Sequence, residues 1–319
     1  MDVTGSALRV AVLRGGRSAE REVSLNTGAQ VAAALAARGH VVAMIDTRET
    51  GFIAAIQDAR PDVVFIALHG RYGEDGTIQG LLELLDLPYV GSGVLASALA
   101  MNKVQTKRIY AAAGLKTPAY EVVRRNEPYD VERLVESLGP DTVVKPANEG
   151  SSVGMTIVHD PALLGTAIEK AFEHDPLVLV ERFELGTEVT VGVIGNDAPE
   201  ALPTLEIVPV NDFYDYESKY VPGMSRHIIP AGVSEEARLE SQRLAVEAHK
   251  VLGCAGMSRS DTIVTAAGEV FLLETNTIPG MTQTSLLPDA AAAAGIPFPD
   301  LCERLIGLAL AMTPAAPRP

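Results

Sequence analysis

Apolar runs and helical stretches alternate along the first part of the chain. Residues 8–13, 41–46 and 63–68 are short apolar runs that end in glycine or polar turns, as buried strands do. The stretch from the turn at Gly15 through Arg38 has the period of an amphipathic helix, and residues 77–85 predict another helix. Strands that alternate with helices predict a doubly wound α/β domain at the amino-terminal end.

The pattern changes after about residue 97. There we expect a long helix that carries Lys103, and farther on a strand that ends at Lys145 and later antiparallel strands. The predicted elements are helix 98–113, strand 119–123, helix 131–138, strands 142–146, 178–182, 189–194 and 202–208, helix 235–252, and a helix that starts at 281. A long polar loop, residues 211–224, has no period of its own and is typical of a lid.

These patterns divide the chain into α/β and α+β parts. The expected organisation is an amino-terminal domain over 1–96, a central lobe over 97–187, a carboxyl-terminal lobe over 188–313 and a disordered tail over 314–319.

A predicted hairpin gathers oxygen ligands near the carboxyl end. The runs 257–264 and 271–273 read as strands joined by a turn over 265–269. Glu274 and Asn276 are two positions apart, so an extended chain places both on one face, and pairing brings Asp261 beside them. Such an all-oxygen set suits Mg²⁺, although a solvated acidic strand end would equally account for Asp261 alone. Arg259 lies beside the set and favours the metal interpretation.

Polar residues follow two strands of the amino-terminal domain. Glu20 follows the first strand and its Gly15–Gly16 turn, and His69 follows the third, at the edge where doubly wound folds bind ligands. Glu20 could equally serve as an acid in a first helical turn. His69 could be a structural histidine, but its position at a strand end favours a role in the site. The glycines do not form the Gly-x-Gly-x-x-Gly fingerprint, so they do not predict dinucleotide binding.

Lys145 precedes a loop of small residues, 147–154. Small side chains let backbone N–H groups approach phosphate oxygens, and the lysine adds positive charge. The lysine comes before the glycines, so this is not a P-loop. A solvated hairpin loop is the alternative, but a lysine that interrupts an apolar strand favours the phosphate site.

Composition narrows the class of protein. The net charge is −15, from 26 Lys+Arg and 41 Asp+Glu, which disfavours nucleic acid as a partner. Cys254 and Cys302 are the only cysteines, so we expect no disulfide framework and a cytoplasmic setting. We find no signal-peptide pattern and no apolar run of about 20 residues, so we expect no membrane association.

Several motifs together resemble the D-alanine–D-alanine ligase family of the ATP-grasp superfamily. The resemblance covers nearly the whole chain in one order. The matching stretches are 15–24 (GGRSAEREVS), 67–70 (ALHG), 73–76 (GEDG), 145–146 (KP), 149–154 (EGSSVG), 213–220 (FYDYESKY), 259–261 (RSD) and 274–282 (ETNTIPGMT). It implies an ATP-grasp fold with three domains, in which two lobes hold ATP between them. Asn148, Arg182, Ser258 and Ser260 depart from the residues common in the family.

The resemblance also implies roles for individual residues. Catalytic residues would be Glu20, Ser151, Tyr220, Arg259 and Gly280. The D-alanine substrates would contact His69, Ser285 and Leu286. ATP would contact Lys103, Lys145, Glu181, Phe183, Glu188 and Lys219, and two Mg²⁺ or Mn²⁺ ions would be held by Asp261, Glu274 and Asn276.

The implied reaction is the ATP-dependent joining of two D-alanine molecules for peptidoglycan precursors. ATP would activate one carboxylate as an acylphosphate, which needs positioning and charge neutralisation. The second amine would then attack, with Arg259 stabilising the oxyanion. A cytoplasmic homodimer is implied as well.

Three alternatives remain at this stage. Within the same class, the chain could be a D-alanine–D-lactate ligase or another carboxylate–amine ligase, although Tyr220 and the lid argue against lactate. A non-catalytic nucleotide-binding protein would be expected to lack some of Asp261, Glu274, Asn276 and Arg259, and all are present. A dehydrogenase is disfavoured by the missing glycine fingerprint.

Overall fold

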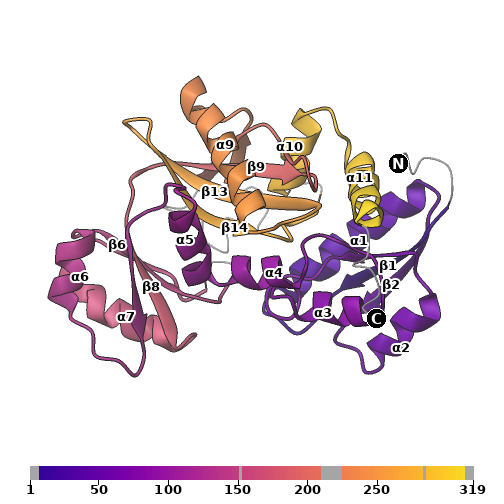
Figure 1. Ribbon diagram of the computed structural model, residues 1–319, viewed down its shortest axis with the longest axis horizontal. Helices are drawn as coiled ribbons and strands as arrows, with labels where there is room; N and C mark the ends of the chain where they lie inside the picture. Colours follow the sequence, from indigo (N-terminus) through magenta and orange to yellow (C-terminus); the bar gives the residue numbers. More distant parts are fainter. Residues whose placement is uncertain (1–6, 151–152, 210–224, 283–284, 313–319) are drawn as a thin grey trace.

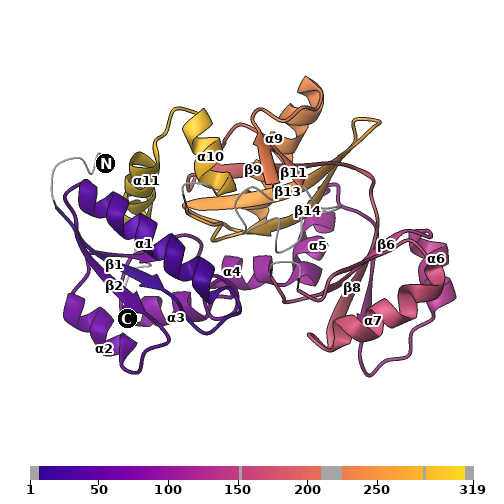
Figure 2. The ribbon, with the colours of Figure 1, turned by 180° about the vertical axis from the view of Figure 1, so that it is seen from behind.

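Three sheets, each with its own helices, succeed one another along the chain. The computed structural model describes residues 7–150, 153–209, 225–282 and 285–312. Figures 1 and 2 show the amino-terminal sheet at one end, the central sheet at the other, and the carboxyl-terminal sheet above and between them. No helix within these ranges is both long enough and apolar enough to cross a bilayer.

The amino-terminal sheet is parallel, as the alternating pattern predicted. Its strand order is β2-β1-β3-β4, so ligand-facing loops gather at one edge. The elements are β1 Arg9–Arg14, α1 Arg21–Ala37, β2 Val41–Asp46, α2 Phe52–Ala59, β3 Val63–Ile66, α3 Thr77–Leu84 and β4 Tyr89–Val90. Helix α2 and strand β4 were not predicted.

The single helix expected over 98–113 is wrong. Two helices stand there, α4 (Val94–Met101) and α5 (Lys103–Ala112), separated by Asn102 in an extended conformation with φ −88° and ψ 100°. The Asn102 side chain accepts a hydrogen bond from the backbone N–H of Gln105, which caps α5. The break places Lys103 at the start of α5, where its N–H donates to the carbonyl of Ala147 at 2.9 Å.

The central sheet is antiparallel, with strand order β5-β8-β6-β7. Helices α6 and α7 pack their apolar sides on it, and Leu134, Leu138, Ile168 and Phe172 form a core with strand residues. The elements are β5 Tyr120–Arg124, α6 Val131–Leu138, β6 Thr142–Pro146, β7 Thr156–Val158, a 3₁₀ turn Pro161–Leu163, α7 Leu164–Phe172 and β8 Leu177–Arg182. Strand β7 and helix α7 were not predicted.

The carboxyl-terminal sheet is built around β9 and β13. Its order is β12-β11-β9-β13-β14, with β10 also paired to β9. Helix α9 packs against β9, β13 and β14. The elements are β9 Gly186–Ile194, β10 Glu200–Ala201, β11 Leu205–Pro209, β12 Ser225–Ile228, α9 Glu235–Val251, β13 Met257–Thr265 and β14 Val270–Asn276.

The last two helices return to the first sheet. Helix α10 (Leu286–Ala293) and helix α11 (Phe298–Ala311) contribute Leu287, Leu301 and Leu305 to the core of the amino-terminal domain. The helix predicted to start at 281 begins later, at Leu286, because the backbone of Ser285 is still extended (φ −83°, ψ 152°) and forms the N-cap. The expected domain boundaries stay predictions.

Candidate active site

Glu20 lies where the amino-terminal sheet meets the loop that follows β6. It occupies the N-cap position of α1, but its side chain makes no capping hydrogen bond. A β-carbon placed on Gly70 would come 2.8 Å from Oε2 of Glu20, and one placed on Gly150 would come 3.2 Å from the same oxygen. The Glu20 carboxylate therefore lies between Gly70, in the loop after β3, and Gly150, in the loop after β6, and its role at a substrate stays a prediction.

The glycine turn before Glu20 is held by two hydroxyls. Ser24 Oγ accepts from the N–H of Gly15 at 2.8 Å and donates to the carbonyl of Ala67 at 2.6 Å. Ser18 Oγ donates to the carbonyl of His69 at 2.7 Å and accepts from the N–H of Glu20 at 3.2 Å. These bonds tie the loops after β1 and β3 together and fix the start of α1.

His69 is buried beside two acids. Its Nε2 lies 3.2 Å from Oγ1 of Thr27, and its Nδ1 lies 4.0 Å from Oε1 of Glu74. Burial lowers the pKa of His69, but the nearby Glu74 and the charge of Glu20 outweigh that effect and raise it above the ordinary value. The two acids therefore favour the charged form of His69, and its contact with a substrate stays a prediction.

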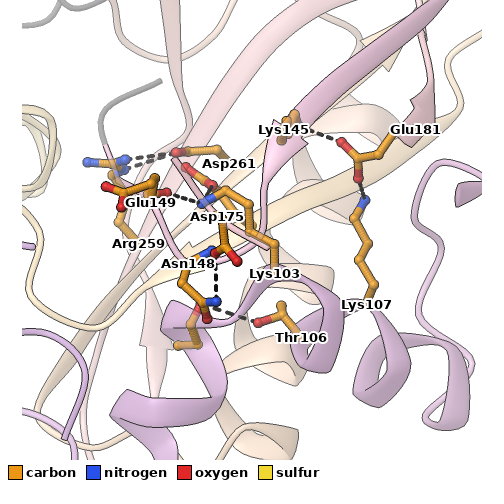
Figure 3. A network of polar contacts seen from close by, with 12 residues as sticks. Lys103, Thr106, Lys107, Lys145, Asn148, Glu149, Asp175, Glu181, Arg259 and Asp261 are labelled. Carbon is orange, nitrogen blue, oxygen red and sulfur yellow. Dashed lines mark hydrogen bonds and ion pairs between the residues drawn. The ribbon is translucent and has the colours of Figure 1, made fainter. Parts of the chain in front are cut away.

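Lys103 joins the two lobes. Its ammonium donates to the carbonyl of Glu149 at 2.7 Å and lies 3.5 Å from Oε2 of Glu274. Glu149 precedes Gly150 in the small-residue loop, and Glu274 belongs to strand β14. Lys103 therefore connects the loop that contacts Glu20 with the predicted metal site, as Figure 3 shows in part.

A buried trio of charges lies beside this junction. Strands β6 and β8 pair so that Lys145 and Glu181 share a face, and the Lys145 ammonium lies 2.5 Å from Oε2 of Glu181. The other oxygen, Oε1, forms an ion pair with Lys107 of helix α5 (Figure 3). Lys107 also donates to Oγ1 of Thr117 at 2.5 Å. The sequence analysis did not identify Lys107.

Burial and the charges of its neighbours shift the pKa of each member of the trio. Burial raises the pKa of Glu181, but the two ammonium groups outweigh burial and hold the pKa below its ordinary value. Burial also opposes the charge on Lys145, yet Glu181, Glu274 and Glu188 raise its pKa. Burial lowers the pKa of Lys107 despite its pairing with Glu181.

The predicted hairpin and its pairing are confirmed. Strands β13 and β14 pair antiparallel with Asp261 opposite Glu274 and Arg259 opposite Asn276. The Arg259 guanidinium binds Asp261 through two hydrogen bonds, Nε to Oδ1 at 2.9 Å and Nη2 to Oδ2 at 2.8 Å. Thr190 of β9 also donates to Asp261 Oδ1 at 2.6 Å. The arginine and threonine orient the carboxylate, and the guanidinium compensates its charge.

The residues of this hairpin fit a hard divalent cation. Two carboxylates and one amide offer only oxygen, the ligand type that Mg²⁺ and Mn²⁺ accept. The described ranges contain no group of three or more His, Cys, Asp or Glu side chains arranged to hold a metal ion. The metal assignment therefore rests on Asp261, Glu274 and the amide of Asn276, and it stays a prediction.

A layer of buried polar side chains supports the hairpin from its other face. Tyr110 of α5 is fully buried, and its hydroxyl lies 2.6 Å from Oγ1 of Thr275, which lies 2.7 Å from Oγ of Ser260. Ser258 lies 2.8 Å from Nδ1 of His249 on α9. Both serines depart from the residues common in the family, and each has a buried hydrogen-bond partner.

Asn148 also has a defined role. Its backbone N–H and side-chain amide donate to Oδ2 of Asp175 at 2.9 and 2.7 Å, and its Oδ1 accepts from Asn102 at 2.7 Å. Asn148 thereby links the base of the small-residue loop to the cap of α5, just before Lys103 (Figure 3). The departure at Arg182 is accommodated by a bond from its Nε to the carbonyl of Leu138 at 3.0 Å.

The turn after β14 brings Gly280 against Ser285. A β-carbon on Gly280 would come 2.9 Å from Oγ of Ser285, and that hydroxyl accepts from the N–H of Thr282 at 3.1 Å. Ser285 is the N-cap of α10 and Leu286 its first residue. Both lie at a helix start, whose N–H groups favour an anion.

The remaining expected site residues divide into two groups. Phe183 follows β8, and its N–H already donates to the carbonyl of Asp141 at 3.0 Å, while Glu188 lies on β9 opposite Ile263. The assigned roles of both stay predictions. Ser151, Lys219 and Tyr220, and the lid expected over 211–224, lie outside the described residues.

Known proteins match the chain over nearly its whole length. A family model described as D-ala D-ala ligase C-terminus matches residues 109–307, and one described as D-ala D-ala ligase N-terminus matches residues 46–92. A D-alanine–D-alanine ligase of Pelotomaculum thermopropionicum is 51% identical over 309 residues, 95% of this chain and 97% of the relative. The chain belongs to the D-alanine–D-alanine ligase family.

Solved structures of the family confirm the fold. A Bacillus anthracis D-alanine–D-alanine ligase complexed with ATP has a TM-score of 0.84 and 32% identity, over 95% of this chain and 98% of that one. The ligase of Coxiella burnetii has a TM-score of 0.83 and 30% identity, over 96% and 94%. The ATP-grasp prediction and the family resemblance are therefore confirmed.

Three features of the site escaped the sequence analysis. Lys107 follows Lys103 by four positions on one helix, so its helical spacing could have identified it as a neighbour. Thr190 and Tyr110 carry no such signal, because their partners Asp261 and Thr275 lie 71 and 165 residues away.

Proposed function

We propose that this chain joins two D-alanine molecules to D-alanyl-D-alanine, with ATP converted to ADP and phosphate, for peptidoglycan precursors. The observation that carries the proposal is one continuous line of contacts. It runs from Glu20 to Gly150, from Glu149 to Lys103, and from Lys103 to Glu274. It joins a carboxylate suited to an ammonium group (Glu20) with a lysine suited to phosphate (Lys103) and an acid suited to a metal ion (Glu274).

Nucleotide binding is assigned to the face shared by the two lobes. Lys103 and Lys145 would contact phosphate, because their ammonium groups lie at the small-residue loop and the Glu181 carboxylate. Glu181 and the backbone around Phe183 would bind adenine, and Glu188 the ribose. Lys219 would add charge at the γ-phosphate.

Asp261, Glu274 and Asn276 would hold two Mg²⁺ or Mn²⁺ ions. When bound, the ions would supply charge neutralisation at the phosphates. The chain itself orients the first ligand, since Arg259 and Thr190 fix both oxygens of Asp261. Lys103 likewise fixes Glu274.

Substrate positions follow from charge. Glu20 would bind the ammonium of the first D-alanine, with His69 near its carboxylate and Ser151 and Tyr220 in one network beside it. The carboxylate attacks the γ-phosphate, ADP leaves, and an acylphosphate forms. Ser285 and Leu286 at the start of α10 would bind the second carboxylate. The amine of the second D-alanine then attacks the acyl carbon of the acylphosphate. Arg259 and the Gly280 backbone would stabilise the oxyanion that forms, and phosphate leaves.

The test is phosphate release from ATP with D-alanine alone, with L-alanine alone, or with D-alanine together with D-lactate, and the product is analysed by mass. We expect release with D-alanine and a product of D-alanyl-D-alanine mass. Release with D-lactate in the presence of D-alanine, giving an ester, would identify a D-alanine–D-lactate ligase instead. No release with D-alanine would refute the proposal.

Location and assembly are further parts of the proposal. A cytoplasmic enzyme fits the need for ATP, and free cysteines at Cys254 and Cys302 fit a reducing compartment. A homodimer is proposed by family resemblance, and light scattering of the purified chain measures it.

A further inference from the structure

Lys107 is a buried cation that no step of the proposed reaction uses. Its residue surface is 1% exposed, and it pairs with Oε1 of Glu181. Its second contact, Thr117 Oγ1, in turn donates to the carbonyl of Leu272 on β14 at 2.7 Å. The ammonium is therefore fixed among helix α5, strand β8 and strand β14, on the side of Glu181 away from solvent.

The two lysines around Glu181 are not equivalent. The Lys145 side chain is 14% exposed, whereas that of Lys107 is 1% exposed. Only Lys145 can therefore turn to an incoming ligand without unfolding its surroundings. The negative charges of Glu274 on β14 and Glu188 on β9 also raise the pKa of Lys145.

We propose that Lys107 is a positioning residue for nucleotide binding: it neutralises Glu181 from the buried side, so that Lys145 can exchange Glu181 for a nucleotide phosphate. With Lys107 present, the trio has a net charge of +1, and Glu181 keeps a cation when Lys145 leaves. Without Lys107, Lys145 is the remaining cation paired with Glu181 among the described residues. Moving it to a phosphate would then leave a buried carboxylate unpaired, which is strongly unfavourable.

This inference rests on the proposed role of Lys145 at a phosphate, and it makes a specific prediction. Loss of Lys107 should weaken the binding of ATP more than that of adenosine. The proposed contact of Glu181 with adenine is common to both ligands, so a change there cancels in the comparison. A residue that only supported the fold would weaken both alike. The ratio of the adenosine Kd to the ATP Kd therefore separates the two roles.

The experiment measures both constants without D-alanine, for the wild type, Lys107→Met and the double variant Lys107→Met/Glu181→Gln. ATP is titrated with Mg²⁺ by calorimetry, and adenosine is measured by displacement of ATP. Lys107→Met should lower the ratio about tenfold, the value of one charged hydrogen bond. The double variant restores the net charge of +1 and should return the ratio to within about threefold of wild type.

Lys116→Met is the matched control. Lys116 also pairs with a glutamate, Glu269 at 2.6 Å, but both side chains are about half exposed. The ratio should not change in this control.

The outcomes decide the proposal in every case. An unchanged ratio in folded Lys107→Met, or an equal loss in the double variant, overturns it. If Lys107→Met does not fold, the double variant decides alone, because it leaves no buried carboxylate without a cation: a ratio near wild type supports the proposal and a tenfold loss overturns it. Phosphate release with D-alanine tests the ligase function separately. If the protein is an active ligase but Lys107→Met does not change the ratio of the two Kd values, only this inference is refuted.

Discussion

Gly70→Ala is expected to displace the Glu20 side chain. Its cost in stability should equal that of a glycine-to-alanine substitution at another left-handed position with open space around it. Gly70 has φ +68°, and a β-carbon there would lie 2.8 Å from Oε2 of Glu20 and 3.2 Å from Cβ of Ser18. Gly253→Ala is the matched control, because Gly253 has φ +72° and nothing within 4 Å of the added carbon. Both variants bear the same left-handed backbone strain, about 1–2 kcal/mol.

The size of the displacement follows from the contact distance. An ordinary contact begins at 3.4 Å, so an oxygen at 2.8 Å must retreat by about 0.6 Å, the difference between the two. The carboxylate is the end of a flexible side chain, so the movement costs little stability. A misplacement of about 1 Å in a substrate-positioning group can cost roughly a hundredfold in rate. We therefore expect kcat/KM for D-alanine to fall by about 10- to 100-fold.

The assay is initial-rate phosphate release at varied D-alanine and saturating ATP, with urea unfolding of both variants. Gly253→Ala should keep kcat/KM within about twofold of wild type, since a surface change far from the site has a small effect. The KM for ATP should not change in either variant. Equal kcat/KM in the two variants would refute the placement of Glu20 at the substrate.

Three further predictions concern the metal-site hairpin and its support. Glu274→Gln and Asn276→Ala should each abolish turnover with an unchanged circular dichroism spectrum, because each removes an oxygen ligand; wild-type rates across a Mg²⁺ titration would exclude that role. Burial lowers the pKa of His249 from 6.5 to about 4. Above pH 6.5 this histidine is neutral in the folded and the unfolded chain, and the stability is complete. As the pH falls from 6.5 to 4 only the unfolded chain takes up the proton, so the free energy of unfolding decreases by at most about 3 kcal/mol. Urea unfolding at pH 7.5 and 4.5 should show a smaller pH dependence in His249→Gln, and an equal dependence would contradict the assignment. Tyr110→Phe should lower the free energy of unfolding by about 1–3 kcal/mol, since it removes a buried hydrogen bond. Tyr89→Phe, whose hydroxyl bonds an exposed glutamate, should cost about 0.5 kcal/mol or less, and equal costs would count against a buried network.

Local patterns predicted much of the fold and part of the site. The hairpin of β13 and β14 has its turn within a few residues, so spacing alone placed Asp261, Glu274 and Asn276 near one another. The amino-terminal α/β domain was predicted for the same reason, because each of its helices directly follows a strand. Ordered motifs then identified the family.

The break at Asn102 shows where local patterns fail. Apolar spacing predicts one continuous helix over residues 98–113. The chain bends at Asn102 because its side chain caps α5 and bonds Asn148 of a distant loop. A cap whose value depends on a partner far along the chain cannot be read from periodicity.

The sequence by itself determined most of the longer strands, the hairpin that carries the acidic residues, and the family. The tertiary structure alone decided which partner each polar side chain has. Lys107 reaches Glu181, Tyr110 reaches Thr275, and helix α11 returns to the first sheet. The bond between Tyr110 and Thr275 joins residues 165 positions apart, and α11 lies still farther along the chain from the first sheet. Burial makes such partners necessary, since a polar group without water needs another to satisfy it, but only the packed chain shows which group that is.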